Sequence, residues 1–218
     1  VIGTNIGSDI FQQNFILPIV GIIGTIVVVK KNLDIEVGAL TAAALLVWIF
    51  SLGGFISRIE GIILLVSYSA YLIYLKKSKV SESFKRLNNL SNKEIYLAVS
   101  LVLISFVIMA LVTDEVLDAS TVLVDSLPIS ASFFGIILLG IASALPELTT
   151  SLIAVFKGKK DISAGILIGS NITNPLLGIG LGAVISTYTV PNVVVFYDLP
   201  VKIATGLLIY YFYNLYKI

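Results

Sequence analysis

The chain has 218 residues, of which 57% are hydrophobic and 12% are charged, and its formal net charge is +1. Soluble domains carry about 25% charged residues, and the deficit here extends along the whole sequence, which excludes a soluble domain with a single leader or anchor. The absence of Cys and His excludes thiol chemistry, haem, soft-metal sites and His-based triads, and the near-neutral charge does not indicate nucleic-acid binding.

Seven apolar segments are long enough to cross a membrane as helices. In chain order they cover about residues 6–29, 37–55, 59–75, 95–112, 132–156, 162–186 and 193–216. The sequence therefore predicts an all-α fold, a polytopic bundle of helices in a lipid bilayer. We divide it into residues 1–75 with three spans, a polar loop at 76–93, and residues 94–218 with four spans.

The polar loop at 76–93 contains six basic residues and one acidic residue. Short loops rich in Lys and Arg stay in the cytoplasm, so we place this loop inside. Alternating spans then bring two more basic clusters to the same side and a group of carboxylates to the outer side. The clusters are Lys30 and Lys31, then Lys157, Lys159 and Lys160; the carboxylates are Asp114, Glu115, Asp118 and Asp125. We expect a multi-pass protein of a prokaryotic-type plasma membrane.

Residues 114–128 follow the fourth span and permit two interpretations. Leu117, Val122, Leu123 and Leu127 could form an amphipathic continuation of the fourth helix along the outer interface. A plain extracellular loop is the alternative, and the sequence does not decide between them.

The fifth span has a polar centre at Glu147. A carboxylate at the bilayer centre costs at least about 2.5–3.5 kcal/mol, and its own helix offers no nearby Lys or Arg, so its partner must be a cation, a proton or a residue from elsewhere. Pro146 frees a backbone carbonyl near Ala142, which can serve as a cation ligand. The hydroxyls that share the helical face of Glu147 belong to Ser143, Thr150 and Ser151.

A short polar motif recurs in the first and sixth spans. Residues 6–12 are IGSDIFQ and residues 168–174 are IGSNITN, identical at four of seven positions. The copies are an odd number of spans apart, five, so they cross the membrane in opposite directions, as in inverted-topology repeats with a site near the midplane. Packing through small residues is the alternative, but packing does not require the amides. The candidate ligands are Ser8, Asp9 and Gln12, with Ser170, Asn171 and Asn174.

Oxygen-rich side chains from three spans would suit a hard cation such as Ca2+, which takes 6–8 oxygen ligands. In the seventh span, Asp198 and Lys202 are four residues apart. We expect them to form a pair on the helix surface rather than a site.

The stretch 144–151, ALPELTTS, followed by 169–174, GSNITN, resembles the second alpha-repeat of the calcium/cation antiporter superfamily, and 7–10, GSDI, is similar to the end of the first. The resemblance implies ten helices in two inverted halves, of which the seven spans would be helices three to nine. It places the acidic ligand on Glu147 and hydroxyl or backbone ligands on Ser143 and Ser170. The later polar positions fall on Gln12 and Asn174.

The sequence departs from the family pattern at three positions. Ala144 replaces a Ser that is usual in sodium/calcium exchangers, Asn174 stands where some members have Asp, and Gln12 stands where many have Asn. Fewer ligands would weaken Na+ sites, and the sequence leaves the counter-ion open among Na+, H+ and K+.

These features predict a monomeric secondary antiporter, not an enzyme, that exchanges Ca2+ for Na+ or H+ by alternating access without a cofactor. The alternatives are a cation channel, or a non-transporting membrane protein in which Glu147 is a structural carboxylate. Because Val1 begins within an apolar stretch, we expect the chain to be part of a longer protein. The first repeat's own Pro-Glu-like motif would then precede Val1, and the fragment would not exchange ions alone.

Overall fold

A computed structural model of the chain describes residues 2–24, 30–77, 91–126, 128, 130 and 133–216. The chain forms two compact units, and each is described by itself. Unit 1 comprises Val1–Leu72 and Ser132–Ile218, and unit 2 comprises Ile73–Ala131.

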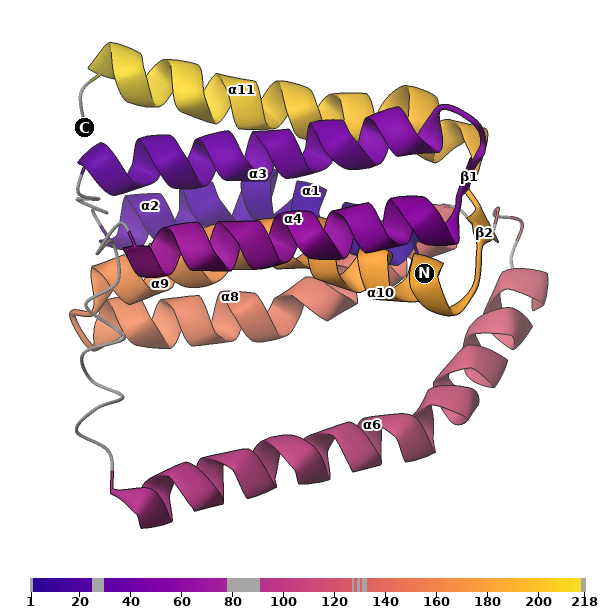
Figure 1. Cartoon of the computed structure of the whole chain (residues 1–218), viewed down its shortest axis with the longest axis horizontal. Helices are drawn as coiled ribbons and strands as arrows, with labels where there is room; N and C mark the ends of the chain where they lie inside the picture. The colour runs from indigo at the N-terminus through magenta and orange to yellow at the C-terminus, as the bar shows by residue number, and fades with distance from the viewer. Residues whose placement is uncertain are drawn as a thin grey trace. The chain divides into compact units, whose positions relative to one another are not determined.

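The helices of unit 1 lie side by side as a bundle, with a short pair of strands at one end (Figure 1). In the first half they are α1 (Ile2–Phe11), the π-helical turn η1 (Gln12–Ile16), α2 (Leu17–Gly24), α3 (Lys30–Ser51) and α4 (Arg58–Lys77). In the second half they are η2 (Phe134–Leu139), α8 (Gly140–Phe156), α9 (Lys160–Thr173), η3 (Asn174–Ile179), α10 (Gly180–Ile185), η4 (Val194–Asp198) and α11 (Leu199–Tyr216).

Two of the π-helical turns have a local cause in proline. A proline ring clashes with the carbonyl four residues earlier and offers it no N–H donor, and membrane helices accommodate this by local π widening. Pro18 and Pro200 act in this way on the carbonyls of Asn14, within η1, and Phe196, within η4. In both turns the residue after the turn donates to the first residue of it, from Leu17 to Gln12 and from Leu199 to Val194.

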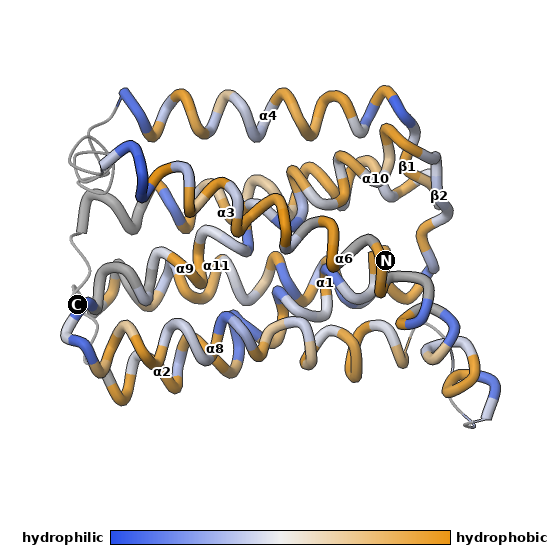
Figure 2. The backbone as a smooth tube through the Cα atoms, turned by 90° about the horizontal axis from the view of Figure 1, so that it is seen from below, coloured by the Kyte–Doolittle hydropathy of each residue, from blue (hydrophilic) through white to orange (hydrophobic). Residues whose placement is uncertain are grey.

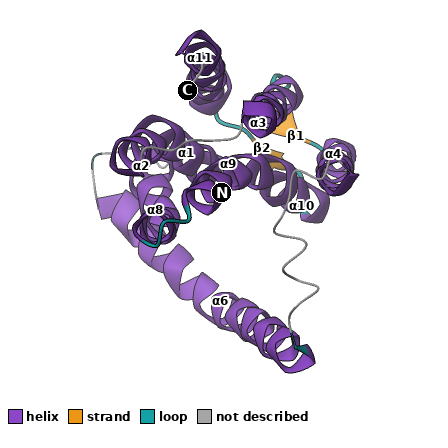
Figure 3. Cartoon of the chain, turned by 90° about the vertical axis from the view of Figure 1, so that its left-hand side faces the viewer, coloured by secondary structure: helices purple, strands orange, loops and turns teal. Residues whose placement is uncertain are grey.

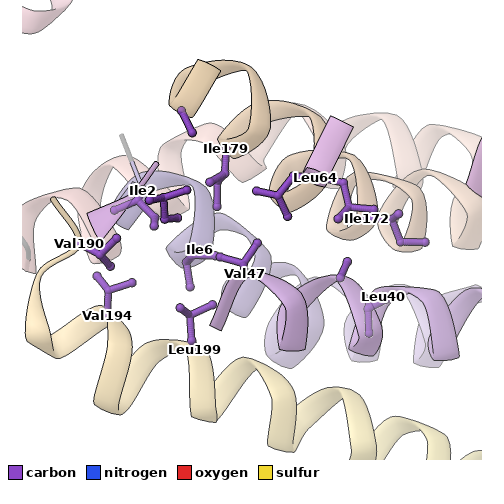
Figure 4. Packing of buried hydrophobic residues seen from close by; sticks show 14 of the residues in the cluster. Ile2, Ile6, Leu40, Val47, Leu64, Ile172, Ile179, Val190, Val194 and Leu199 are labelled. Atoms are coloured by element: carbon purple, nitrogen blue, oxygen red, sulfur yellow. The ribbon is translucent and has the colours of Figure 1, made fainter. Parts of the chain in front are cut away.

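The helix α1 is the interior element of unit 1. It packs against η2, α8, η3, η4 and α11 (Figure 3). Its apolar side enters a cluster of buried side chains from several helices, of which Figure 4 shows Ile6, Val47, Ile172 and Leu199, each with 0% of its surface exposed. This packing fixes the face of α1 that carries the polar motif.

The strands β1 (Phe55–Ile56) and β2 (Tyr188–Thr189) pair antiparallel, with Phe55 opposite Thr189 and Ile56 opposite Tyr188. The Val190 N–H also donates to the Gly54 carbonyl at 2.8 Å. The pair therefore ties the α3–α4 loop to the segment between α10 and η4.

Unit 2 contains α6 (Asn92–Ser126), one helix of 35 residues. Ser91 and Glu94 form a capping box: the Glu94 carboxylate accepts from the Ser91 N–H at 2.8 Å, and the Ser91 hydroxyl accepts from the Lys93 N–H at 3.2 Å. Helix continues through 114–126, so of the two interpretations of 114–128 the helical continuation is correct. Leu127 lies outside the described residues.

The predicted class, a polytopic membrane bundle, is confirmed. Within the described ranges, five helices are long and apolar enough to cross a membrane: Ile2–Ile23, Arg58–Lys77, Phe134–Phe156, Gly165–Ile185 and Val194–Phe212, together with a shorter apolar helix, Ile35–Ser51. They coincide with predicted spans one, three, five, six and seven, and with part of the second. The fourth predicted span, 95–112, lies within α6 (Asn92–Ser126), which is not one of these five helices, so the count of seven stays a prediction. The orientation and the division at 76–93 also stay predictions, and residues 78–90 lie outside the described part of the chain.

Gly7 and Gly140 bring the backbones of α1 and α8 into direct contact. A Cβ at Gly7 would lie 2.2 Å from the Ile136 carbonyl oxygen, and one at Gly140 would lie 2.8 Å from the Gly7 carbonyl carbon. Glycine in the repeated motif therefore has a packing role in its first copy, as small residues do between membrane helices.

We predict that Gly7→Ala lowers the free energy of unfolding by about 1–3 kcal/mol, because the backbone contact cannot admit a methyl group. Gly21→Ala on the same helical segment is the matched control, since nothing lies within 4 Å of its added Cβ. Alanine favours helix there by up to about 1 kcal/mol. Thermal unfolding in detergent compares the two, and equal melting temperatures would contradict the packing role of Gly7.

Candidate cation site

Glu147 lies partway along α8, where hydrophilic residues interrupt an otherwise hydrophobic helix (Figure 2). Its side chain is half-buried, and Oε2 is inaccessible to solvent yet has no hydrogen-bond partner among the described residues. A buried carboxylate oxygen without a donor is costly. This oxygen is therefore the strongest candidate in the fifth span for contact with a cation or a proton.

The hydroxyls beside Glu147 bond to their own helix. Ser143 donates to the Gly140 carbonyl at 2.9 Å, and Thr150 donates to the carbonyls of Pro146 at 2.8 Å and Glu147 at 3.2 Å. Back-bonding of this kind is common for helical Ser and Thr, and it leaves the hydroxyl lone pairs free to accept. Ala142, Ser143 and Thr150 are exposed residues.

Ser151 has a different environment from the other two hydroxyls. It is fully buried, and its hydroxyl donates to the Ser163 carbonyl of α9 at 3.5 Å. The contact joins α8 to α9. Sequence spacing places Ser151 beside Glu147, but its hydroxyl is directed to the neighbouring helix.

The two copies of the polar motif contact one another directly and reciprocally. Gln12, at the seventh position of the first copy, accepts through Oε1 from Nδ2 of Asn171, at the fourth position of the second, at 3.0 Å. Asn174, the seventh residue of the second copy, donates through Nδ2 to Oδ1 of Asp9, the fourth residue of the first, at 2.8 Å. Both copies also turn π-helical at their seventh residue. This two-fold exchange is the geometry of antiparallel, repeat-related helices.

Hydroxyls and a further amide complete the network. Gln12 Nε2 donates to the Ser8 hydroxyl at 3.1 Å, and the Ser170 hydroxyl donates to Gln12 Oε1. Gln13 Nε2 donates to Asn171 Oδ1 at 2.8 Å, while Gln13 Oε1 accepts from the Thr205 hydroxyl at 2.7 Å. Gln13 and Thr205 were not among the residues predicted from the sequence. The only signal for Gln13 was its place beside Gln12 in an apolar span.

The prediction of a surface pair between Asp198 and Lys202 is wrong. Lys202 forms an ion pair with Asp9 of α1, and both side chains are 0% exposed. Asp198 is 4% exposed, and its Oδ2 has no partner among the described residues. Asp198 ends η4 and Lys202 lies in α11, and both of these segments pack on α1, which spacing along the chain cannot reveal. A charge inside an apolar span was the available signal.

The predicted ligands therefore separate into two groups. Glu147 lies with Ala142, Ser143 and Thr150 on α8, whereas the side chains of η1 bond to those of α9, and Asp9 of α1 bonds to Asn174 of η3. Asp9, predicted as a ligand, is already neutralised by Lys202. No hydrogen bond within the described residues joins Glu147 to Ser8, Gln12, Ser170 or Asn174, and the same residues contain no group of three His, Cys, Asp or Glu side chains placed to hold a metal.

The chain has relatives among ion exchangers. The family described as sodium/calcium exchanger protein matches residues 1–77 and 97–217. Inner membrane protein YrbG of Escherichia coli is 28% identical over 194 residues, which are 85% of this chain and 60% of that protein. Thus the chain spans well under two thirds of the length of this relative.

Solved structures resemble it over nearly its whole length. A structure of the sodium-calcium exchanger NCX_Mj has 25% sequence identity and a TM-score of 0.66, covering 97% of this chain and 67% of that one. The structure of an H+/Ca2+ exchanger, CAX, has a TM-score of 0.69 and covers 94% of this chain and 56% of that one. At 17% identity, this second similarity concerns the fold alone.

We predict that Asn171→Leu lowers the free energy of unfolding by about 1–3 kcal/mol, since it leaves Gln12 and Gln13 short of buried hydrogen-bond partners. Asn14→Leu is the control, because Asn14 is exposed and bonds only its own helix, donating to the Ile10 carbonyl. Chemical denaturation in detergent measures both. If both variants lower the free energy of unfolding by a similar small amount, the network does not stabilise the fold as predicted.

We predict a larger effect for Lys202→Met. Removing one partner of a buried ion pair typically costs about 3–5 kcal/mol, because the remaining charge is uncompensated. The double variant Asp9→Asn/Lys202→Met removes both charges and should recover most of the loss. The melting temperatures of the three proteins test this, and a double variant no more stable than Lys202→Met would refute the coupling.

Proposed function

Because the chain belongs to the sodium/calcium exchanger protein family, we propose that it acts in a secondary antiporter that exchanges Ca2+ for Na+ or H+ by alternating access. The protein is an integral, multi-pass membrane protein that acts on small cations. The exchange reaction involves cations as substrates and requires no cofactor.

The observation that carries this proposal is the unpartnered oxygen of Glu147. Oε2 is buried in an apolar helix, and no side chain or backbone donor among the described residues meets it. A carboxylate in this setting needs a cation or a proton. Competition of Ca2+ with a monovalent ion for one carboxylate is the chemical basis of an antiporter.

The ligands around Glu147 are oxygen atoms, as a hard cation requires. The hydroxyls of Ser143 and Thr150 and the carbonyl at Ala142 lie on the same helical face. The two hydrogen-bonded copies of the polar motif supply the other proposed ligands: Ser8, Asp9, Gln12, Ser170, Asn171 and Asn174. Ser151, at the α8–α9 contact, is the last member of the proposed set. The hydrogen bonds between the two motif copies also have a positioning role, because they hold α1 and η1 in fixed register against α9 and η3.

Alternating access follows from charge compensation. A site whose carboxylate is matched by Ca2+ or by monovalent ions can change its exposure across the apolar layer, whereas an uncompensated charge is costly to move. The bundle would then change between its inward-facing and outward-facing states when the site is occupied, and would stay in one state when the site is empty. We propose that it does so as a monomer, with the loop at 76–93 in the cytoplasm of a prokaryotic-type cell.

We predict that Glu147→Gln in the full-length protein abolishes counter-ion-driven 45Ca2+ uptake by membrane vesicles, because the amide has no charge for the cation. Glu115→Gln is the matched control: Glu115 is exposed on α6, so its uptake should equal that of the wild type. Imposed Na+ and pH gradients, applied separately, identify the counter-ion.

Three outcomes oppose the proposal. Unchanged uptake by Glu147→Gln would remove the carboxylate from the mechanism. Uptake that neither saturates nor depends on a counter-ion on the opposite side would indicate a channel. If the wild type binds and moves no Ca2+ while Glu147→Gln melts at a lower temperature, the carboxylate has only a structural role.

A further inference from the structure

Near the Asp9–Lys202 ion pair, side chains of three helical segments of unit 1 contact one another at successive helical turns. At one level, Asp9 of α1 bonds both Asn174 of η3 and Lys202 of α11. One turn further along, Gln13 bonds Thr205. Residue numbers on α1 and α11 therefore rise together, so these helices run parallel. Gln12 bonds Asn171 while Asp9 bonds Asn174, so the helix that leads into η3 runs antiparallel to α1.

The same register defines the next level towards the β1–β2 end of the bundle. One helical turn, four residues, separates Asp9 from Asn5, Lys202 from Asp198 and Asn174 from Gly178. Direct geometry supports this level: Asn5 Nδ2 lies 2.9 Å from the position of a Cβ on Gly178, and η4, which ends at Asp198, packs against α1. The register therefore assigns Asn5 and Asp198 to the same level of the bundle, on two segments, α1 and η4, that pack against each other.

Two acceptor oxygens at this level have no donor. Asp198 is 4% exposed, and its Oδ2 is buried without a hydrogen-bond partner among the described residues. Asn5 Oδ1 is likewise buried and without a partner there. A buried acceptor without a donor costs about 1–3 kcal/mol, and a charged one costs more. Two of them at one level, on different helical segments, call for a shared donor or cation.

The charge count indicates which kind of ion fits. The Asp9–Lys202 pair is neutral, so Asp198 adds one uncompensated negative charge. Within the described residues no group of three acidic side chains is placed to hold a metal, and a divalent ion held by one carboxylate would leave an excess of charge. One carboxylate and one amide oxygen match a small monovalent cation.

We propose that Asn5 Oδ1 and Asp198 Oδ2 bind Na+, one helical turn from the Asp9–Lys202 pair and separate from Glu147. This site does not depend on the proposed exchange at Glu147. It places a monovalent cation between α1 and η4, one turn towards the β1–β2 end from the Asp9–Lys202 pair.

The test uses the full-length protein carrying Glu147→Gln, so that the proposed central site does not contribute. Its melting temperature is measured in detergent while Na+ replaces choline at constant ionic strength. A ligand that binds only the folded state raises the melting temperature, and we expect a rise of about 2–4 °C for a protein of this size. Adding Asp198→Asn should abolish the rise, and adding Asn5→Ala should shift it to higher Na+ concentration.

The control is Asp118→Asn in the same background, since Asp118 is exposed on α6, and it should leave the rise unchanged. A Na+-dependent rise that survives Asp198→Asn overturns the proposal. So does the absence of any difference between Na+ and choline, the result expected if the Asn5 amide is turned to donate to Asp198. Loss of 45Ca2+ exchange in Glu147→Gln bears only on the proposed function, because the melting experiment is made in that background.

Discussion

Compensation of polar groups inside an apolar bundle is the constraint on which the rest of this structure depends. Water cannot reach the centre of the bundle to satisfy a carboxylate or an amide, so each must find a partner on another helix. Asp9 is matched by Lys202 and Asn174, and Gln12 and Gln13 by the polar residues of α9 and α11. These contacts set the register of three helices and leave Glu147 Oε2 without a protein partner among the described residues.

The glycines make this compensation possible. Gly7 and Gly140 allow α1 to approach α8 at backbone distance, and the helix then presents its other faces to η3 and α11. One seven-residue motif thus combines a packing position, Gly7, with two network positions, Asp9 and Gln12. The π-helical turn that begins at Gln12 widens the helix where the polar side chains project, which is typical of functional regions.

The candidate site was partly predictable from the sequence. Glu147 was identifiable because a carboxylate in an apolar span is rare and costly, and its unpartnered oxygen is consistent with that interpretation. The repeated motif predicted an antiparallel meeting of two helices, and the reciprocal bonds of Gln12 and Asn174 supply it. Lys202 was misassigned, because four-residue spacing to Asp198 says which residues share a helical face but not which neighbouring helix covers that face.

The sequence by itself determined the membrane bundle, the approximate places of its helices and the polar centres within them, because hydrophobic length and rare polar residues are local properties of the chain. Only the tertiary structure decided the partners: that Asp9 is neutralised by a lysine 193 residues away, that Ser151 turns to α9, and that Asn5 and Asp198 share one level. Partner choice depends on how helices approach and rotate against one another, and that is fixed by close contacts such as the one at Gly7, which act across the bundle rather than along the sequence.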